Sequence, residues 1–390
     1  MRLIPGRRTA AGAVLAGVLL ALPTVPASAG VARAAVEGPD CLSLRSDSDE
    51  RTVKGPNTAN ETLQVPRAQE LARARGAGVT VIVVDSTDQS AHGTAVGGIV
   101  VGRDQTAPTE VGVGIAPEAG LQSRPFYDVP AGNGGGDNGR EPSSSALAGV
   151  LDGIHPGKRT IVLVPTQVAR SAALENALDR LTRAGALVVA AAGDRPAEGV
   201  FPDQLATRKA GEDAAGVIWP AAHPGVLSVS ASDPGAWDQG TVLRNSGVDL
   251  AAPGADTVSI GLNGGHCALT QASSAWAAAE VAGVAALVWS AFPTDDAARL
   301  TTRLEQTASG NGGPTSPRIG YGVVQPVEAL QRRLDAMSRP RAEPPVPAQA
   351  PRPAADVLAT TRSRAVWWGL GGGAALVVLV VLRPLLARRR

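Results

Sequence analysis

The sequence predicts an α/β fold: a doubly wound, mainly parallel sheet with helices on both faces. Short apolar runs rich in β-branched residues alternate with helical patterns along residues 75–337, and this alternation is typical of strand–helix–strand units. The runs are apolar at consecutive positions, as expected of parallel strands that are covered on both sides. Residues 276–289 are apolar all round, which predicts a helix through the middle of the fold.

The elements follow one another in a regular order. The expected strands are residues 78–84, 121–126, 160–164, 186–192, 226–230 and an edge region at 248–253. The expected helices are the segment that His92 opens and residues 145–154, 172–184, 276–289 and 295–307. Residues 130–145 are rich in Gly, Asn and Ser, which favours a surface loop. Because no internal repeat is visible, we expect one large domain with a sizeable core.

The two ends of the chain predict export and membrane anchoring. Residues 1–29 have a positive start, an apolar run and a small-residue cleavage site, which is the pattern of a signal peptide. Residues 365–386 contain an uncharged stretch long enough to cross a bilayer. Trp367 and Trp368 stand at its outer edge, and the arginines that follow place residues 387–390 in the cytoplasm. We therefore expect a single-pass plasma membrane protein whose bulk lies outside the cell.

The remaining segments complete the domain organisation. Residues 30–74 are expected to form an N-terminal extension that wraps the domain at 75–337. Residues 338–361 are rich in proline, a composition that makes a semi-rigid, extended linker rather than a fold. The net charge is +1 and the domain has no basic cluster, so nothing indicates a nucleic-acid partner.

The chain has two cysteines, Cys41 and Cys267. An even pair in an exported chain predicts a disulfide. The alternative is a metal site built on His266 and Cys267, but further ligands at a suitable spacing are missing from the sequence. We therefore expect neither a metal nor a cofactor.

Three polar residues stand at ends of the predicted elements: two follow strands, and one begins a helix. Asp85 ends the first strand, His92 comes after a six-residue loop, and Asp194 follows the strand at 186–192. In doubly wound sheets functional groups gather at the carboxyl ends of strands, and Asp, His and a helix-borne hydroxyl are the parts of a nucleophilic triad. Taken singly, each residue is more often a turn or cap residue.

Taken together, seven segments resemble the landmarks of the subtilisin-like serine proteases (subtilases). They are, in order, VTVIVVDS, HGTAVGGIV, VGIAPEAGLQS, LVVAAAGD, WPAAHPGVLSVSASD, VDLAAPG and AEVAGVAAL. The resemblance covers the chain from about residue 75 to 330. The signal peptide, the Cys-containing segment, the closing IGYGVVQPVEAL, the Pro-rich linker and the anchor resemble one branch, the mycosins of actinobacteria and their relatives. The resemblance implies a subtilisin-like fold and a role beside the membrane complex of a type VII secretion system.

The resemblance also implies roles for individual residues. Asp85 matches the acid that orients the imidazole, and His92 matches the general base. The family's serine stands six residues ahead of a Val-Ala-Gly, and counting back from Val281 reaches Ala275. The asparagine that lines the family's oxyanion hole is Asp194 here.

These departures predict that peptide hydrolysis is lost. The methyl group of Ala275 has no lone pair, so it forms no acyl-enzyme. A carboxylate at Asp194 offers no donor to a developing oxyanion unless burial keeps it protonated, and losing one such donor typically costs about 2.7–4 kcal/mol of transition-state stabilisation. Loss of the nucleophile costs more, and such losses are not additive.

Two further departures agree with this prediction. The family has a long loop between its acid and its histidine, whereas this chain has only residues 86–91. Six extended residues still span enough distance for a contact between Asp85 and His92. The segment IVLVPTQ replaces a strand end that pairs with substrate backbone in the family, and Pro165 removes a donor there.

Ser274 is the alternative nucleophile, and Ser273 is a weaker one. One step along a helix turns a side chain by about 100° and moves it by about 1.5 Å, which breaks alignment with a fixed histidine. Serine is also a preferred helix N-cap, and both residues stand where the central helix is expected to begin.

Three functions are therefore compared. The first is a catalytically inactive pseudoprotease that acts as a scaffold or binding component of a type VII secretion system. The second is an active serine endopeptidase that uses Ser274. The third is a different enzyme or a ligand-binding protein that uses Asp85, His92 and Asp194 as polar groups.

Overall fold

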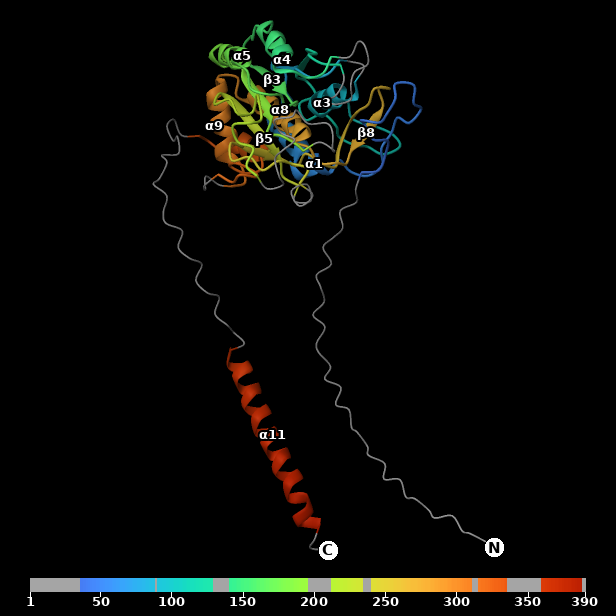
Figure 1. The fold of residues 1–390 in the computed structure, drawn as a ribbon. Helices are drawn as coiled ribbons and strands as arrows, with labels where there is room; N and C mark the ends of the chain where they lie inside the picture. The colour runs from blue at the N-terminus through green and yellow to red at the C-terminus, as the bar shows by residue number, and fades with distance from the viewer. Residues whose placement is uncertain are drawn as a thin grey trace, which may run out of the picture. The chain divides into compact units, whose positions relative to one another are not determined.

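The computed structural model describes residues 36–87, 90–128, 140–195, 212–233, 240–310, 315–334 and 359–387. The chain divides into two compact units, residues 1–337 and 338–390 (Figure 1), and each is described by itself. The predicted signal peptide, residues 338–358 of the predicted linker and residues 388–390 lie outside the described residues.

A six-stranded parallel sheet forms the centre of the first unit, which confirms the predicted fold class. Its strands lie in the order β2-β1-β3-β4-β5-β6, and every neighbouring pair is parallel. The strands are β1 (Thr80–Val83), β2 (Gly120–Ser123), β3 (Thr160–Val164), β4 (Leu187–Ala191), β5 (Val226–Ala231) and β6 (Leu250–Ala252). Because all of them run in one direction, their carboxyl ends meet at one edge of the sheet.

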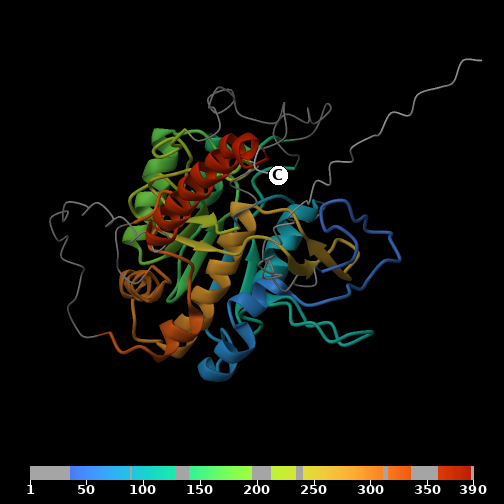
Figure 2. The same cartoon turned by 90° about the horizontal axis from the view of Figure 1, so that it is seen from below.

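Helices cover both faces of this sheet (Figure 2). One face carries α3 (Ala91–Val101) and α8 (Ser274–Ala291), and the other carries α4 (Ser144–Asp152) and α5 (Ala172–Arg183). Successive side chains of a strand point to opposite faces of the sheet, so each strand contributes to two separate cores. In β1, for example, Val81 packs with α3 and α8, whereas Ile82 packs with α4 and α5.

Helix α8 is the predicted central helix. Its residues from Ser274 to Ser290 are all buried, and small side chains let neighbouring segments approach closely. A Cβ at Gly283, for instance, would lie 2.8 Å from the Cβ of Ile115. The helix is long and apolar enough to cross a membrane, but 94% of that stretch is buried inside the unit. It is therefore a core helix.

Strand β2 is shorter than the predicted strand at 121–126. The N–H of Arg124 donates to the carbonyl of Val83 at 2.8 Å, and this bond continues the ladder beyond Ser123. Pro125 follows and has no N–H to donate. The missing N–H would point away from β1, so bonding on that side continues, with the N–H of Phe126 donating to the carbonyl of Asp85 at 2.9 Å.

Several elements were not foreseen from the sequence. They are α1 (Thr58–Thr62), α2 (Val65–Ala72), the antiparallel hairpin of β7 (Thr257–Ile260) and β8 (His266–Leu269), and α10 (Pro326–Gln331). The surface helix expected at 295–307 is α9 (Ala297–Thr307), which Asp296 caps by accepting the N–H of Arg299. Helices α2, α9 and α10 belong to the core around α8.

The predicted disulfide between Cys41 and Cys267 is confirmed. It joins the N-terminal extension to β8, and backbone bonds flank it on both sides. The N–H of Cys41 donates to the carbonyl of Ala268 at 3.1 Å, and the N–H of Ala268 donates to the carbonyl of Pro39 at 2.8 Å. The extension is thus attached to the hairpin as an additional short strand pair.

The described residues of the second unit form helix α11 (Ala359–Ala387). Residues 364–383 of this helix are long and apolar enough to cross a membrane. They make α11 a candidate for the predicted membrane anchor.

Replacing both Cys41 and Cys267 with serine is expected to lower the melting temperature. The two cysteines are 226 residues apart in the chain, so the bond removes much unfolded-state entropy, with a ceiling of about 5 kcal/mol. Thermal unfolding with and without reductant measures the effect. Reductant should lower the Tm of the wild-type chain and leave that of the double variant unchanged, and equal Tm values for the two proteins would contradict this role.

Candidate functional site

The structure brings Asp85 and His92 together at the carboxyl edge of the sheet. Asp85 follows β1, and His92 lies in the first turn of α3. The His92 Nδ1 lies 2.6 Å from Asp85 Oδ2. The short connection at 86–91 therefore permits the contact that the sequence predicts.

Asp85 is fully enclosed and bonded on both oxygens. Its exposed fraction is 1%, and its Oδ1 accepts the hydroxyls of Tyr127 at 2.6 Å and Thr166 at 3.0 Å. Burial opposes its ionisation, but the charge and hydrogen bond of His92 and the two hydroxyls outweigh burial and lower the pKa of Asp85. For His92, burial opposes the charged ring, but Asp85 and the more distant charge of Asp194 raise its pKa.

Tyr127 and Thr166 were missed in the sequence. They follow β2 and β3, which are the two neighbours of β1 in the sheet. The order of strands would have pointed to them, because residues just after adjacent parallel strands meet at the same edge.

Asp194 lies at the amino end of α8. Its Oδ1 accepts the N–H of Ser274 at 2.8 Å, and its Oδ2 accepts the hydroxyl of Ser273 at 2.6 Å. Burial raises the pKa of Asp194, and the bonds from Ser273 and Ser274 oppose that rise. The free N–H groups at the start of a helix attract anions. At the start of α8, the side chain of Asp194 takes this place.

Within the described residues, neither serine at this helix end forms a hydrogen bond with His92. Ser273 is the N-cap and accepts the N–H of Ala275 at 3.0 Å. Ser274 is completely buried, and its hydroxyl accepts the N–H of Gly193 at 3.2 Å. The hydroxyls therefore serve the helix end and its connection to β4.

Ala275 and Trp276 form the first turn of α8 beside the histidine. Ala275 is buried and presents a methyl group. The Trp276 ring packs against the His92 ring with centroids 4.8 Å apart and an angle of 38° between the planes. The His92 ring is therefore held by two contacts, the packing against Trp276 and the bond to Asp85. Trp276 was not identified as a site residue in the sequence.

Gln167 closes the gap between the ends of β3 and β4. Its side-chain amide donates to the carbonyl of Asp194 at 3.0 Å and accepts the N–H of Asp194 at 3.0 Å. Gly193 makes room for it, because a Cβ there would lie 3.1 Å from Gln167 Oε1, and its φ is 117°. The main-chain groups of Asp194 are therefore occupied.

A buried carboxylic acid lies further along α8. Glu280 is completely buried, and its Oε2 accepts the N–H of Gly254 at 2.9 Å. Burial raises the pKa of Glu280 to about 8, and the bond from Gly254 only partly opposes this. Glu280 is therefore neutral at pH 7.

The site combines an imidazole that Asp85 orients with a methyl group at position 275. His92 is set up by Asp85 as a base would be, but Ala275 provides no hydroxyl and Asp194 places a carboxylate at the helix end where an oxyanion would need donors. Within the described residues, no three His, Cys, Asp or Glu side chains form a group that could hold a metal ion.

The chain is similar to known proteins in sequence and in fold. The model of the subtilase family (Peptidase_S8) matches residues 83–322. Mycosin-1 from Mycobacterium tuberculosis is 27% identical over 350 residues, which are 76% of this chain and 76% of that protein. The crystal structure of MycP1 with its N-terminal propeptide removed has a TM-score of 0.53 at 25% identity, covering 71% of this chain and 98% of that chain.

A further likeness is one of fold alone. A chain in the structure of an intact ESX-5 inner membrane complex has a TM-score of 0.57 at 22% identity. The match covers 89% of this chain and 92% of that chain.

The substitution Asp85→Asn is expected to lower the pKa of His92, because it removes the negative charge that stabilises the imidazolium ion. NMR titration of the ring measures this, and with four histidines in the chain a His92→Gln variant assigns the signal. Asp152→Asn, on the exposed side of α4, is the matched control and should leave the titration unchanged. An unchanged His92 titration in Asp85→Asn would contradict the described pair.

Glu280→Gln is expected to flatten the dependence of stability on pH. The pKa of Glu280 in the fold, about 8, exceeds that of an unfolded glutamic acid, so stability decreases as pH rises through the interval between them and is constant above it. Each unit of difference corresponds to about 1.4 kcal/mol. Unfolding at about pH 5 and about pH 9 tests this.

The variant and the wild-type chain should be similarly stable at the acidic pH, with the variant more stable at the alkaline pH. Asp249 and Glu305 also have raised pKa values, about 6 and about 7, but both are present in the two proteins, so the difference isolates Glu280. A difference that is the same at both pH values would refute the assignment.

Proposed function

The chain belongs to the subtilase family, and we propose that it is a catalytically inactive member that acts as a scaffold or binding component of a type VII secretion system. The observation that carries the proposal is the carboxylate of Asp194 on the amino end of α8, beside Ala275 in place of a nucleophile. By the resemblance, Ala275 takes the position of the family's serine hydroxyl, and Asp194 takes the position of its hydrogen-bond donor.

The chemistry supports inactivity at two steps. Acyl transfer needs a nucleophile within reach of the base. In the first turn of α8, Ala275 offers only a methyl group, and the hydroxyl of Ser274 is buried and bonded to Gly193. Acyl transfer also needs free donors for the developing oxyanion. The N–H of Ser274 is bonded to Asp194, and the N–H of Ala275 is bonded to Ser273.

The geometry of the strand ends also disfavours a bound substrate peptide. A peptide in extended conformation binds such a site by pairing with free main-chain groups. Gln167 already occupies the N–H and the carbonyl of Asp194. Pro165, which follows β3, has no N–H to offer.

Location and partner are inferred from the ends of the chain and from the similarity to Mycosin-1. Helix α11 is the candidate anchor, and the expected signal peptide would place the first unit on the outer face of the plasma membrane. The partners would then be membrane proteins of a type VII secretion complex on that face.

The alternative, an active endopeptidase using Ser274, is disfavoured by the structure. The Ser274 hydroxyl is completely buried and accepts the N–H of Gly193, so it is turned into the fold. No described contact favours Ser273 either, since its hydroxyl donates to Asp194.

A fluorophosphonate probe tests inactivity directly. The full chain in detergent is expected to remain unlabelled beside an active subtilase as a positive control, and Ala275→Ser alone is expected to remain unlabelled because Asp194 still occupies the helix end. The double variant Ala275→Ser/Asp194→Asn should gain labelling at residue 275, since Asp85 and His92 keep their contact.

A triple variant that adds His92→Ala serves as the control and should lose the labelling again. Labelling of the wild-type chain at Ser273 or Ser274, mapped by mass spectrometry, would show that the chain is a protease. Co-purification of the full chain with type VII secretion membrane proteins from native membranes tests the partner, and its absence from such complexes would remove the second half of the proposal.

A further inference from the structure

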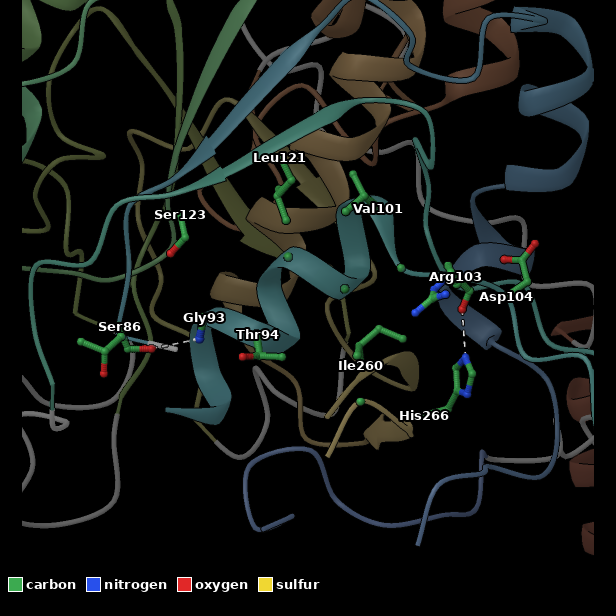
Figure 3. Close-up of a pocket in the computed structure, with 15 residues that line it drawn as sticks. Ser86, Gly93, Thr94, Val101, Arg103, Asp104, Leu121, Ser123, Ile260 and His266 are labelled. Carbon is green, nitrogen blue, oxygen red and sulfur yellow. Dashed lines mark hydrogen bonds between the residues drawn. The ribbon is translucent and has the colours of Figure 1, made fainter. Parts of the chain in front are cut away.

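A hollow lies along α3, beside the ends of β1 and β2. It has a volume of about 560 Å³ and lies between β2 and the β7–β8 hairpin (Figure 3). Gly93, Gly97 and Gly98 form its floor, and Leu121 and Ile260 stand on opposite sides. None of the residues that fill the helix end of α8 lines it.

The glycines of α3 let the segments around the hollow pack closely against the helix. A Cβ at Gly97 would lie 3.0 Å from the end of the Leu121 side chain, and a Cβ at Gly98 would lie 2.6 Å from the backbone nitrogen of Ile260. Of the described residues that connect β1 to α3, Ser86 and Thr87 line the hollow. Leu121 is left 40% exposed.

The edge of β2 borders this hollow and has no further strand beside it among the described residues. Gly120 and Arg124 donate their N–H groups to β1, at 2.9 and 2.8 Å. In a parallel ladder the alternate residues then direct their backbone groups to the other side. The N–H groups of Leu121 and Ser123 thus face away from β1, and both side chains line the hollow.

The outer carbonyl groups are also accessible to a partner. That of Ser123 accepts only the exposed side chain of its neighbour Arg124, at 3.2 Å. An exposed strand edge of this kind offers paired donors and acceptors to another extended chain.

A cation stands at the other end of the hollow. Figure 3 shows the Arg103 guanidinium directed toward the Val101 and Ile260 side, with Asp104 beyond it. The Arg103 carbonyl accepts His266 Nε2 at 2.9 Å, which holds the backbone in place. The guanidinium itself makes no ion pair or hydrogen bond within the described part of the chain, whereas Asp104 accepts the N–H of Val113 at 2.9 Å.

We propose that the edge of β2 and the hollow over α3 are a docking site for an extended, acidic segment of a partner polypeptide. The segment adds to β2 as a further strand and bonds the outward backbone groups of Leu121 and Ser123. One of its aliphatic side chains enters the hollow between Leu121 and Ile260, and a carboxylate pairs with Arg103. Strand addition of this kind takes affinity from main-chain bonds and specificity from the pockets for alternate side chains.

The proposal does not depend on the loss of catalysis. It rests on residues of β2, α3 and the hairpin, and it holds for an active or an inactive enzyme. Its failure would leave the proposed function standing.

The test uses a phage-displayed library of linear peptides selected on the full chain in detergent. Enriched peptides should combine alternating apolar residues with an acidic residue, and a synthetic copy should slow hydrogen exchange at the amides of Leu121 and Ser123. Gly97→Leu, which pushes the Leu121 side chain into the hollow, and Arg103→Glu, which reverses the charge, should each weaken its binding by about tenfold or more.

Matched controls separate docking from folding. Gly149→Leu places the same side chain on α4, where a Cβ meets nothing within 4 Å, and Arg333→Glu reverses an exposed charge beyond α10. Both should bind the peptide as the wild-type chain does. A peptide with lysine in place of its acid should in turn prefer the Arg103→Glu chain, a rescue that a folding defect does not produce.

Four results would overturn the proposal. They are the absence of enriched peptides, equal binding by all four variants, exchange protection at other residues, and a concentration-dependent dimer that protects Leu121 and Ser123 without peptide. The last result would assign this edge to a second copy of the chain.

Discussion

The carboxylate of Asp194 at the amino end of α8 is the contact around which the site is arranged. It connects the end of β4 to the central helix through the N–H of Ser274 and the hydroxyl of Ser273. A helix end surrounded by protein must satisfy its free N–H groups, and an anion suits it because of the helix dipole. Here the anion comes from the chain itself. The same N–H groups therefore serve stability and are unavailable for binding a reacting group.

The survival of Asp85 and His92 has a structural explanation that does not require catalysis. A buried carboxylate is costly unless its oxygens are bonded, and Asp85 is satisfied by His92, Tyr127 and Thr166. These partners come from the start of α3 and from the strands on either side of β1. Removing one of them would leave a buried charge partly unpaired, so the pair contributes to stability whether or not the site is catalytic. Acid and base residues in place are thus no argument for activity.

The sequence predicted the parallel sheet and the central helix well, because buried strands and a helix apolar all round leave strong local patterns. Strand β3 begins and ends at the predicted residues. The partners of Asp85 could not be predicted in this way, since Tyr127 and Thr166 lie 42 and 81 residues away in the chain. Their contact depends on which strands are neighbours. Gln167 was missed for the same reason, because its role requires the ends of β3 and β4 to be placed side by side.

The short connection between β1 and α3 lies next to both the Asp85–His92 pair and the hollow beside β2. It brings His92 to Asp85 directly, and the N–H of Gly93 bonds the Ser86 hydroxyl at 3.0 Å, so α3 begins at the strand end. Ser86, in the same connection, also lines the hollow beside α3 and β2. Gln167 occupies the main-chain groups of Asp194, which an extended chain at the ends of β3 and β4 would need. Among the described residues, β2 has no further strand beside its outer edge. The docking of an extended chain is therefore placed at β2, where backbone groups and a hollow lie next to each other.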